Sequence, residues 1–245
     1  MKYVFSSPDS VKHHLFELGV ENYLLSFAVD ARAIGKFLAP GRFIIVDSGA
    51  FTVWNRGKGE IDIDKYIEFI NGIDANLICI NLDVIPQTGS TKKEIERCVE
   101  RSYENYLYLL DKSKHPILPV YHYGEHINVL KRYANHTDYI GISPANDTHE
   151  NIKRQFLDEV FKFTNTSIKT HGLGYSSFSG LYKYPFYSVD SISYKRIFFH
   201  IDDDRYGFFG SAKALSFFQK KRIKEYLELE KNVTEVWKRR GISWD

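Results

Sequence analysis

The sequence predicts an α/β protein, a single (β/α)8 barrel of the TIM type, on three observations. Short apolar runs alternate with amphipathic helical segments along all 245 residues. About eight such β-then-α units in a chain of this length match the size of that barrel. No low-complexity linker or internal repeat divides the chain, so we expect one domain over residues 1–245, with a charged helical segment from about residue 212.

An open, doubly wound parallel sheet is the competing fold. Such sheets bind phosphate at a glycine-rich turn between a strand and a long helix. The one candidate turn here follows His171, and it lacks both the third glycine and a long helix after it. The barrel is therefore the favoured fold.

The expected strands are the short apolar runs. They cover residues 3–6, 22–28 (a strand or another buried segment), 43–46, 77–82, 116–121, 138–142, 167–170 and 186–189, with 197–201 as a further candidate. Helical spacing of apolar residues predicts helices over 10–18, 62–70, 91–110, 127–134, 151–163 and about 212–240. Pro8 and Asp9 are start signals for the first of these helices.

The stretch from Arg42 to Trp54, RFIIVDSGAFTVW, shows how a site is expected to form. Its apolar run over residues 43–46 is typical of a strand buried on both faces. The strand leads directly into Asp47, Ser48 and Gly49, at the end of the strand where α/β proteins place their chemistry. An ordinary solvated turn is the alternative, because Asp, Ser and Gly are common turn residues.

Nearly every expected strand ends in a polar residue. These residues are Asp47, Asp83, His122, Ser143, His171 and Asp190. Any one of them alone is explained as a cap or turn residue, but in a barrel all six converge on one rim. The sequence therefore predicts an active site there.

Three carboxylates at one rim suit chemistry at a sugar carbon. One ionised Asp attacks the anomeric carbon while a second, held protonated, assists the leaving group. Metal binding is the other use of such a cluster, but none of these three carboxylates lies in an HxH, HExxH or DxD spacing. The run Asp202–Asp204 is typical of a solvated loop. We expect neither a metal nor another cofactor.

Composition limits the partners and the cellular location that we expect for the protein. The formal net charge is +2, which does not by itself indicate a nucleic-acid binder. Basic clusters at 220–224 and 238–240 are interpreted as solvated helix faces, with phosphate contacts as the alternative. Two cysteines are too few for a four-cysteine zinc site or a disulfide framework. With no signal-peptide pattern and no apolar run long enough to span a bilayer, we expect a cytoplasmic protein without a membrane partner.

Several motifs resemble the tRNA-guanine transglycosylase superfamily, and most closely its short phage-associated members that are thought to act on DNA. Residues 47–51, DSGAF, resemble the family's Asp-Ser-Gly-Gly-Phe segment, and Asp83 in INLDVIP resembles its base-recognising aspartate. His122-Tyr-Gly takes the place of a Gln-Gly-Gly turn, and the Gly141 strand that of Leu-Ala-Val-Gly-Glu. Gly172-Leu-Gly and then Asp190 match the turn and strand that lead to the nucleophile. The resemblance covers about residues 42–196 at motif level.

The resemblance implies a role for each matching residue. Asp190 is the expected nucleophile and Asp47 the general acid/base. The expected base-binding residues are Ser48, Gly49, Asp83, His122, Gly141, His171 and Gly172, with Lys195 and Arg196 on the nucleic-acid backbone. Tyr121, Tyr123, Tyr175 and Phe178 flank the mouth, and each is expected either to stack on a base or to pack in the core.

Departures from the family limit what is implied. The cysteine-rich zinc segment of the tRNA enzymes is absent, which favours DNA over tRNA, and His122 replaces the base-reading glutamine. The expected function is therefore removal or exchange of a modified nucleobase through a covalent Asp–sugar intermediate, as a DNA glycosylase (in defence against phage) or a transglycosylase with a free base as second substrate. Two alternatives stay open: a glycoside or nucleoside hydrolase acting on a small substrate, and a catalytically silent nucleic-acid-binding module. Oligomeric state is not predicted.

Overall fold

The computed structural model describes residues 1–55, 59–86, 89–144, 148–195 and 212–244. Within these residues the strands form one parallel sheet in the order β5-β4-β3-β2-β1-β9-β8-β7-β6. The strands are β1 Lys2–Ser6, β2 Asn22–Ser26, β3 Phe43–Asp47, β4 Leu77–Ile80, β5 Ile117–Leu118, β6 Val120–His122, β7 Tyr139–Ser143, β8 Lys169–Gly172 and β9 Ser188–Ser191.

The sheet closes on itself because β5 and β6 are one stretch of chain, separated only by Pro119. On one side, the Leu118 carbonyl accepts a hydrogen bond from the Asn81 amide at 2.9 Å. On the other, the Pro119 carbonyl accepts one from the Gly141 amide at 2.8 Å. Proline has no N–H to donate, so the strand is interrupted there without losing its place in the sheet. The predicted (β/α)8 barrel is confirmed.

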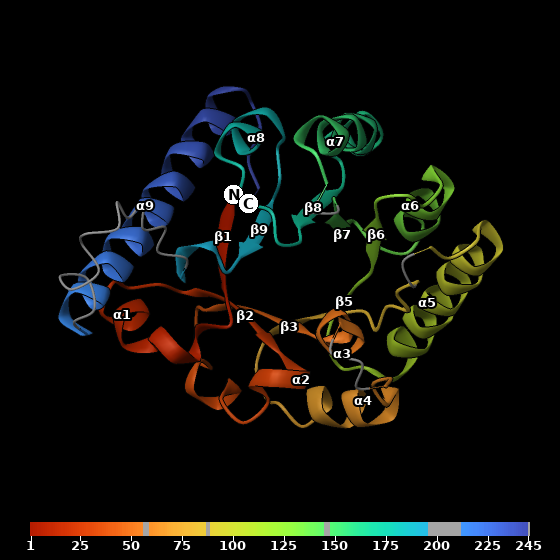
Figure 1. Cartoon of the computed structure of the whole chain (residues 1–245), viewed down its shortest axis with the longest axis horizontal. Coiled ribbons are helices and arrows are strands. Elements are labelled where there is room, and N and C mark those ends of the chain that lie inside the picture. Colours follow the sequence, from red (N-terminus) through yellow and green to blue (C-terminus); the bar gives the residue numbers. More distant parts are fainter. Residues whose placement is uncertain (56–58, 87–88, 145–147, 196–211, 245) are drawn as a thin grey trace.

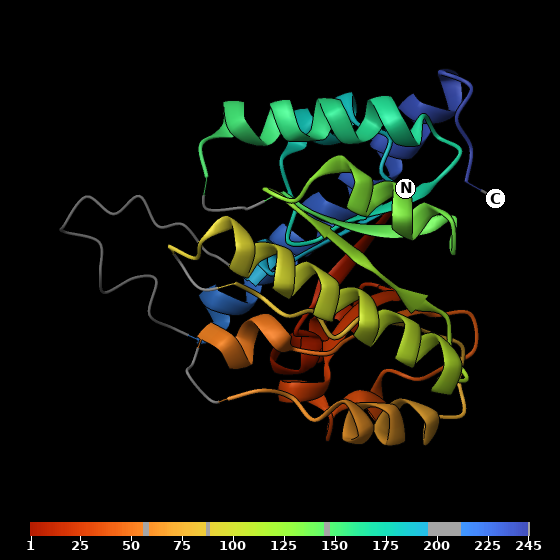
Figure 2. The ribbon, with the colours of Figure 1, turned by 90° about the vertical axis from the view of Figure 1, so that its right-hand side faces the viewer.

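Helices surround the barrel as an outer ring (Figure 1). They are α1 Lys12–Glu17, α2 Phe27–Asp30, α3 Ala50–Asn55, α4 Ile63–Asn71, α5 Lys92–Lys112, α6 Ile127–Ala134, α7 Glu150–Thr164, α8 Phe178–Lys183 and α9 Ala212–Arg239, with 3-10 turns η1 Pro8–Val11, η2 Ile34–Lys36 and η3 Ser193–Lys195. The charged C-terminal helix α9 packs against α1, α8 and β1. Figure 2 shows the molecule from the side, with α5 and α7 on its outer surface. The candidate strand at 197–201 lies outside the described residues.

Local sequence explains where the helices begin. Thr91 and Glu94 form a reciprocal capping box at the start of α5. The Asp62 side chain accepts hydrogen bonds from the amides of Asp64 and Lys65 at the start of α4. None of the helices in the described part of the chain is long and apolar enough to span a membrane.

The barrel interior is apolar in its middle and polar at one end. Val4, Leu24, Ile45, Ile80, Leu118 and Val120 form the buried interior cluster. Because inward positions recur every second residue, the next inward side chains on β1, β2, β3 and β6 are polar: they are Ser6, Ser26, Asp47 and His122. The carboxyl ends of the strands therefore enclose a polar layer next to the apolar interior cluster.

Candidate active site at the carboxyl ends of the strands

Asp47 and Asp190 belong to this polar layer and influence each other. Asp47 is the last residue of β3, and Asp190 lies on β9, paired in register with Val4 of β1. Burial raises the pKa of Asp47 to about 6, against a hydrogen bond from the Gly49 amide, and the charges of Asp190 and Asp30 raise it further. Asp47 thus holds its proton closer to neutral pH than an exposed aspartate does.

Asp190 is fixed by donors on both carboxylate oxygens. Ser6 Oγ donates to Oδ2 at 2.6 Å, and the Gly174 amide donates to Oδ1 at 2.8 Å. His171 Nε2 lies 3.3 Å from the same Oδ1. The side chain is 10% exposed, so it is rigidly held at the edge of the mouth.

His171, expected from the sequence to bind a base, lies deeper than Asp190. It pairs in register with Ser188, two residues before Asp190 on the same face of β9, and is fully buried. Its Nδ1 lies 2.7 Å from Ser188 Oγ, which in turn lies 2.6 Å from Tyr139 Oη. The structure therefore places His171 beneath the carboxylate, where it supports Asp190.

Asp83, His122 and Glu125 form a second cluster on the other side of the mouth. His122 Nε2 lies 3.5 Å from Asp83 Oδ2, and His122 Nδ1 lies 3.3 Å from Glu125 Oε1. Burial raises the pKa of Asp83 to about 7, although the nearby His122 lowers it. Burial would lower the pKa of His122, but the hydrogen bond to Glu125 and the charges of both carboxylates raise it to about 9. Both carboxylates therefore favour the cationic form of His122.

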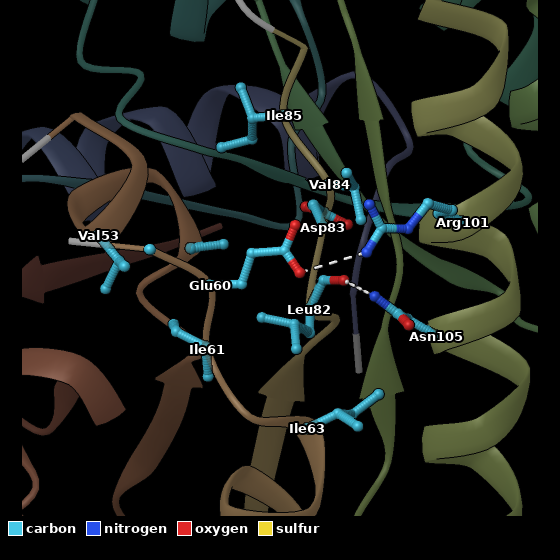
Figure 3. Close-up of a pocket in the computed structure, with 12 residues that line it drawn as sticks. Val53, Glu60, Ile61, Ile63, Leu82, Asp83, Val84, Ile85, Arg101 and Asn105 are labelled. Carbon is cyan, nitrogen blue, oxygen red and sulfur yellow. Dashed lines mark hydrogen bonds and ion pairs between the residues drawn. The ribbon is translucent and has the colours of Figure 1, made fainter. Parts of the chain in front are cut away.

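A cavity of about 220 Å³ opens beside Asp83 (Figure 3). Most of its lining is aliphatic: Ala50, Val53, Ile61, Ile63, Leu82, Val84 and Ile85, with Gly59, Glu60, Arg101 and Asn105 completing it. Glu60 and Arg101 form an ion pair at 3.3 Å across it, and Asn105 Nδ2 donates to the Leu82 carbonyl at 2.8 Å. The cavity is thus a side chamber next to Asp83, with one wall held by α5.

Ser48 and the expected base-binding glycines have structural roles. Ser48 Oγ donates to the Asn81 carbonyl at 3.2 Å, and the residue is 1% exposed. Gly49 has a φ of +83°, and a Cβ there would lie 2.5 Å from Ala28 Cβ. A Cβ on Gly141 would meet Leu173 and Val120 inside the barrel, and one on Gly172 would meet Phe186 and Val189, which belong to the core outside it.

Of the two residues expected to contact the nucleic-acid backbone, only Lys195 lies within the described residues. Lys195 donates to the Ser7 carbonyl, and burial lowers its pKa. It is therefore turned onto the protein's own backbone, and Arg196 lies outside the described residues. Among the flanking aromatics, Tyr121 and Tyr175 are buried, whereas Tyr123 and Phe178 are each 43% exposed.

Sequence reasoning missed Glu125. The signal was its spacing, three residues after His122 in the turn that follows the strand, which brings its carboxylate back onto the imidazole. Within the described ranges, no group of three or more His, Cys, Asp or Glu residues is placed to hold a metal ion.

Comparison with known proteins adds little to this geometry. No protein-family model matches the sequence, and no curated protein matches it. The native KDPGal structure aligns with 94% of this chain and 97% of its own, at 9% identity and a TM-score of 0.49. A designed cube-shaped protein cage aligns with 98% of this chain and 77% of its own, at 9% identity and a TM-score of 0.49. KGPDC from Streptococcus mutans aligns with 96% of this chain and 98% of its own, at 10% identity and a TM-score of 0.44. At these TM-scores the likenesses carry no argument, and the (β/α)8 barrel assignment rests on the strand pairing described above.

Proposed function

We propose that this protein cleaves the N-glycosidic bond of a nucleotide in nucleic acid, DNA in preference to tRNA, and removes or exchanges the base. The observation that carries the proposal is the pair Asp47 and Asp190. They share one polar layer at the barrel mouth, and one of them has a pKa raised to about 6. Enzymes that act at a sugar carbon typically use two carboxylates in different environments, one as the acid and the other as the nucleophile.

Each residue then has a chemical task. Asp190, oriented by Ser6 and Gly174, attacks C1′ and forms an ester with the sugar. Asp47 gives its proton to the departing base. Turning the nucleotide out of a stack costs a few kcal/mol, least for a modified or single-stranded base. The ester is resolved by water, which gives excision, or by a second base, which gives exchange.

Mass spectrometry of released bases tests this proposal. Purified protein is incubated with plain DNA, hypermodified phage DNA and tRNA, beside an Asp190→Ala variant. A free base released by the wild type only, with an abasic site left behind, supports a glycosylase. Release only when another base is supplied supports a transglycosylase. If no substrate loses a base, the proposal fails.

A small-molecule glycoside or nucleoside hydrolase is the second candidate, and the position of Lys195 favours it. That cation contacts the protein's own backbone through the Ser7 carbonyl, so it is not presented to a phosphate. The same two aspartates would then act on a free nucleoside or glycoside. Hydrolysis of free nucleosides by the wild type, with no base released from polymers, would establish this alternative.

A further inference from the structure

The Glu125 carboxylate contacts His122 at two points. Its Oε2 accepts from the His122 backbone amide at 3.0 Å, while Oε1 lies 3.3 Å from the ring Nδ1. The turn that carries Glu125 is itself held, because Tyr121 Oη donates to the Glu125 carbonyl at 3.0 Å. With its side chain only 11% exposed, the carboxylate is shielded from water, so this contact is stronger than a surface ion pair.

The opposite nitrogen of the same ring, Nε2, faces the second carboxylate of the cluster. His122 Nε2 lies 3.5 Å from Asp83 Oδ2, beyond ordinary hydrogen-bond length, and it makes no hydrogen bond within the described chain. Asp83 is restrained by Asn81 Nδ2, which donates to Oδ1 at 2.9 Å. At 30%, the His122 side chain is the most exposed of the three, since Asp83 is 9% and Glu125 is 11% exposed. The Nε2 side of the ring therefore makes only a long ion pair with Asp83 at the mouth.

We propose that Glu125 is a positioning residue that keeps His122 protonated and turned, so that Nε2–H donates to a carbonyl oxygen of the departing base. The inference rests on the proposed function and names its substrate class. Bases that carry an oxo group conjugated to the glycosidic nitrogen fit, as in oxo-pyrimidines and oxo-purines. Adenine-type bases, which have no carbonyl, do not.

The chemical step accounts for every electron pair. As the bond from C1′ to the base nitrogen breaks, its electron pair passes to the base and spreads onto the conjugated oxygen. A lone pair of Asp190 forms the new bond to C1′, and Asp47 transfers its proton to the base. A fixed cation beside the oxygen stabilises charge that develops only during this step, which is how preorganised donors accelerate reactions.

Neighbouring groups support a charged imidazole. The carboxylates Asp83 and Glu125 face it directly, and their charges raise its pKa to about 9. Tyr133 of α6 and Tyr66 of α4 are buried phenols whose pKa values are raised by burial and, to a smaller extent, by the charge of Asp83. Asp47 is the further carboxyl that affects Asp83. None of these neighbours is a cation, so the imidazolium has no like charge among them.

NMR titration of the His122 ring tests the pair without any substrate. The wild-type ring is expected to titrate near pH 9. In Glu125→Gln the midpoint should fall toward the ordinary value of about 6.5, and Glu125→Asp should restore part of the difference. Glu235→Gln, an exposed change on α9, is the matched control and should leave the midpoint unchanged. A wild-type midpoint near the ordinary value, or no change in Glu125→Gln, overturns the inference.

Base release then tests the catalytic consequence. Glu125→Gln is expected to lower kcat at neutral pH about 10-fold or more, with KM little changed, because the lost charge acts during bond breaking. If its kcat equals that of the wild type although the NMR midpoint has moved, the leaving-group role is wrong. If the wild type releases no base at all, the proposed function fails, and the titration still decides whether Glu125 sets the charge of His122.

Discussion

Replacement of Gly49 by alanine is the sharpest stability test, because two separate penalties meet at this residue. Its φ of +83° lies in the left-handed region, which costs a residue with a side chain about 1–2 kcal/mol. In addition, the new Cβ would lie 2.5 Å from Ala28 Cβ and 2.6 Å from Ser26 Oγ. Forcing such contacts apart costs about 1–3 kcal/mol more. We expect Gly49→Ala to lower the free energy of unfolding by about 2–5 kcal/mol.

Gly41 provides a matched control. It has the same φ of +83°, yet nothing lies within 4 Å of the position its Cβ would take. Gly41→Ala should therefore lose only the backbone term, about 1–2 kcal/mol. Urea unfolding of the two variants and the wild type, with equal m-values, gives the difference directly. Equal losses would refute the argument that the loop after Asp47 is packed too closely for a Cβ.

Three further predictions follow from buried groups. Tyr66 Oη donates to the carbonyls of Val46 and Ile80, so Tyr66→Phe should lower the free energy of unfolding by about 1–2 kcal/mol in urea, and no loss would contradict this bridging role. Because the pKa of Asp47 is raised from 3.8 to about 6, its stabilising contribution is complete below pH 3.8 and is lost as pH rises through 6. Between pH 4 and 7 the free energy of unfolding of Asp47→Asn should therefore increase by about 1–3 kcal/mol relative to that of the wild type. Burial raises the pKa of Cys79 to about 12, so a thiol reagent should modify it only after unfolding, and rapid labelling of native protein would exclude the buried position.

The strand centres could be predicted because a buried parallel strand is a continuous apolar run. The run over 43–46 became β3, Phe43–Asp47, with Asp47 at its end as expected. The run over 116–121 became two strands, because Pro119 interrupts the hydrogen bonding. The short helix α8 was missed, since Gly180 weakens its helical pattern. That glycine is needed there because a Cβ would lie 1.8 Å from Tyr175 Oη.

Strand ends were less predictable, and this changes the candidate site. β8 was expected to end at Thr170 but runs to Gly172, so His171 lies inside the barrel. β9 was expected to end at Val189 but runs to Ser191, so Asp190 is a strand residue fixed by Ser6 from the neighbouring strand. Apolar content does not mark these ends, because the last residues of both strands are polar or glycine and are paired only through the sheet.

The two clusters at the mouth predict that kcat falls in two steps as pH rises, one step set by Asp47 and the other by His122. Asp47 must be protonated to act as the acid, so kcat should fall as pH rises through about 6. His122 stays cationic until about pH 9, so its loss produces a second fall only there. Glu125→Gln should therefore bring the second fall to lower pH while the first stays in place. Asp47→Asn should remove the first fall together with most of the activity. A wild-type profile that is flat from pH 5 to 8, with base release intact, would show that another group supplies the proton.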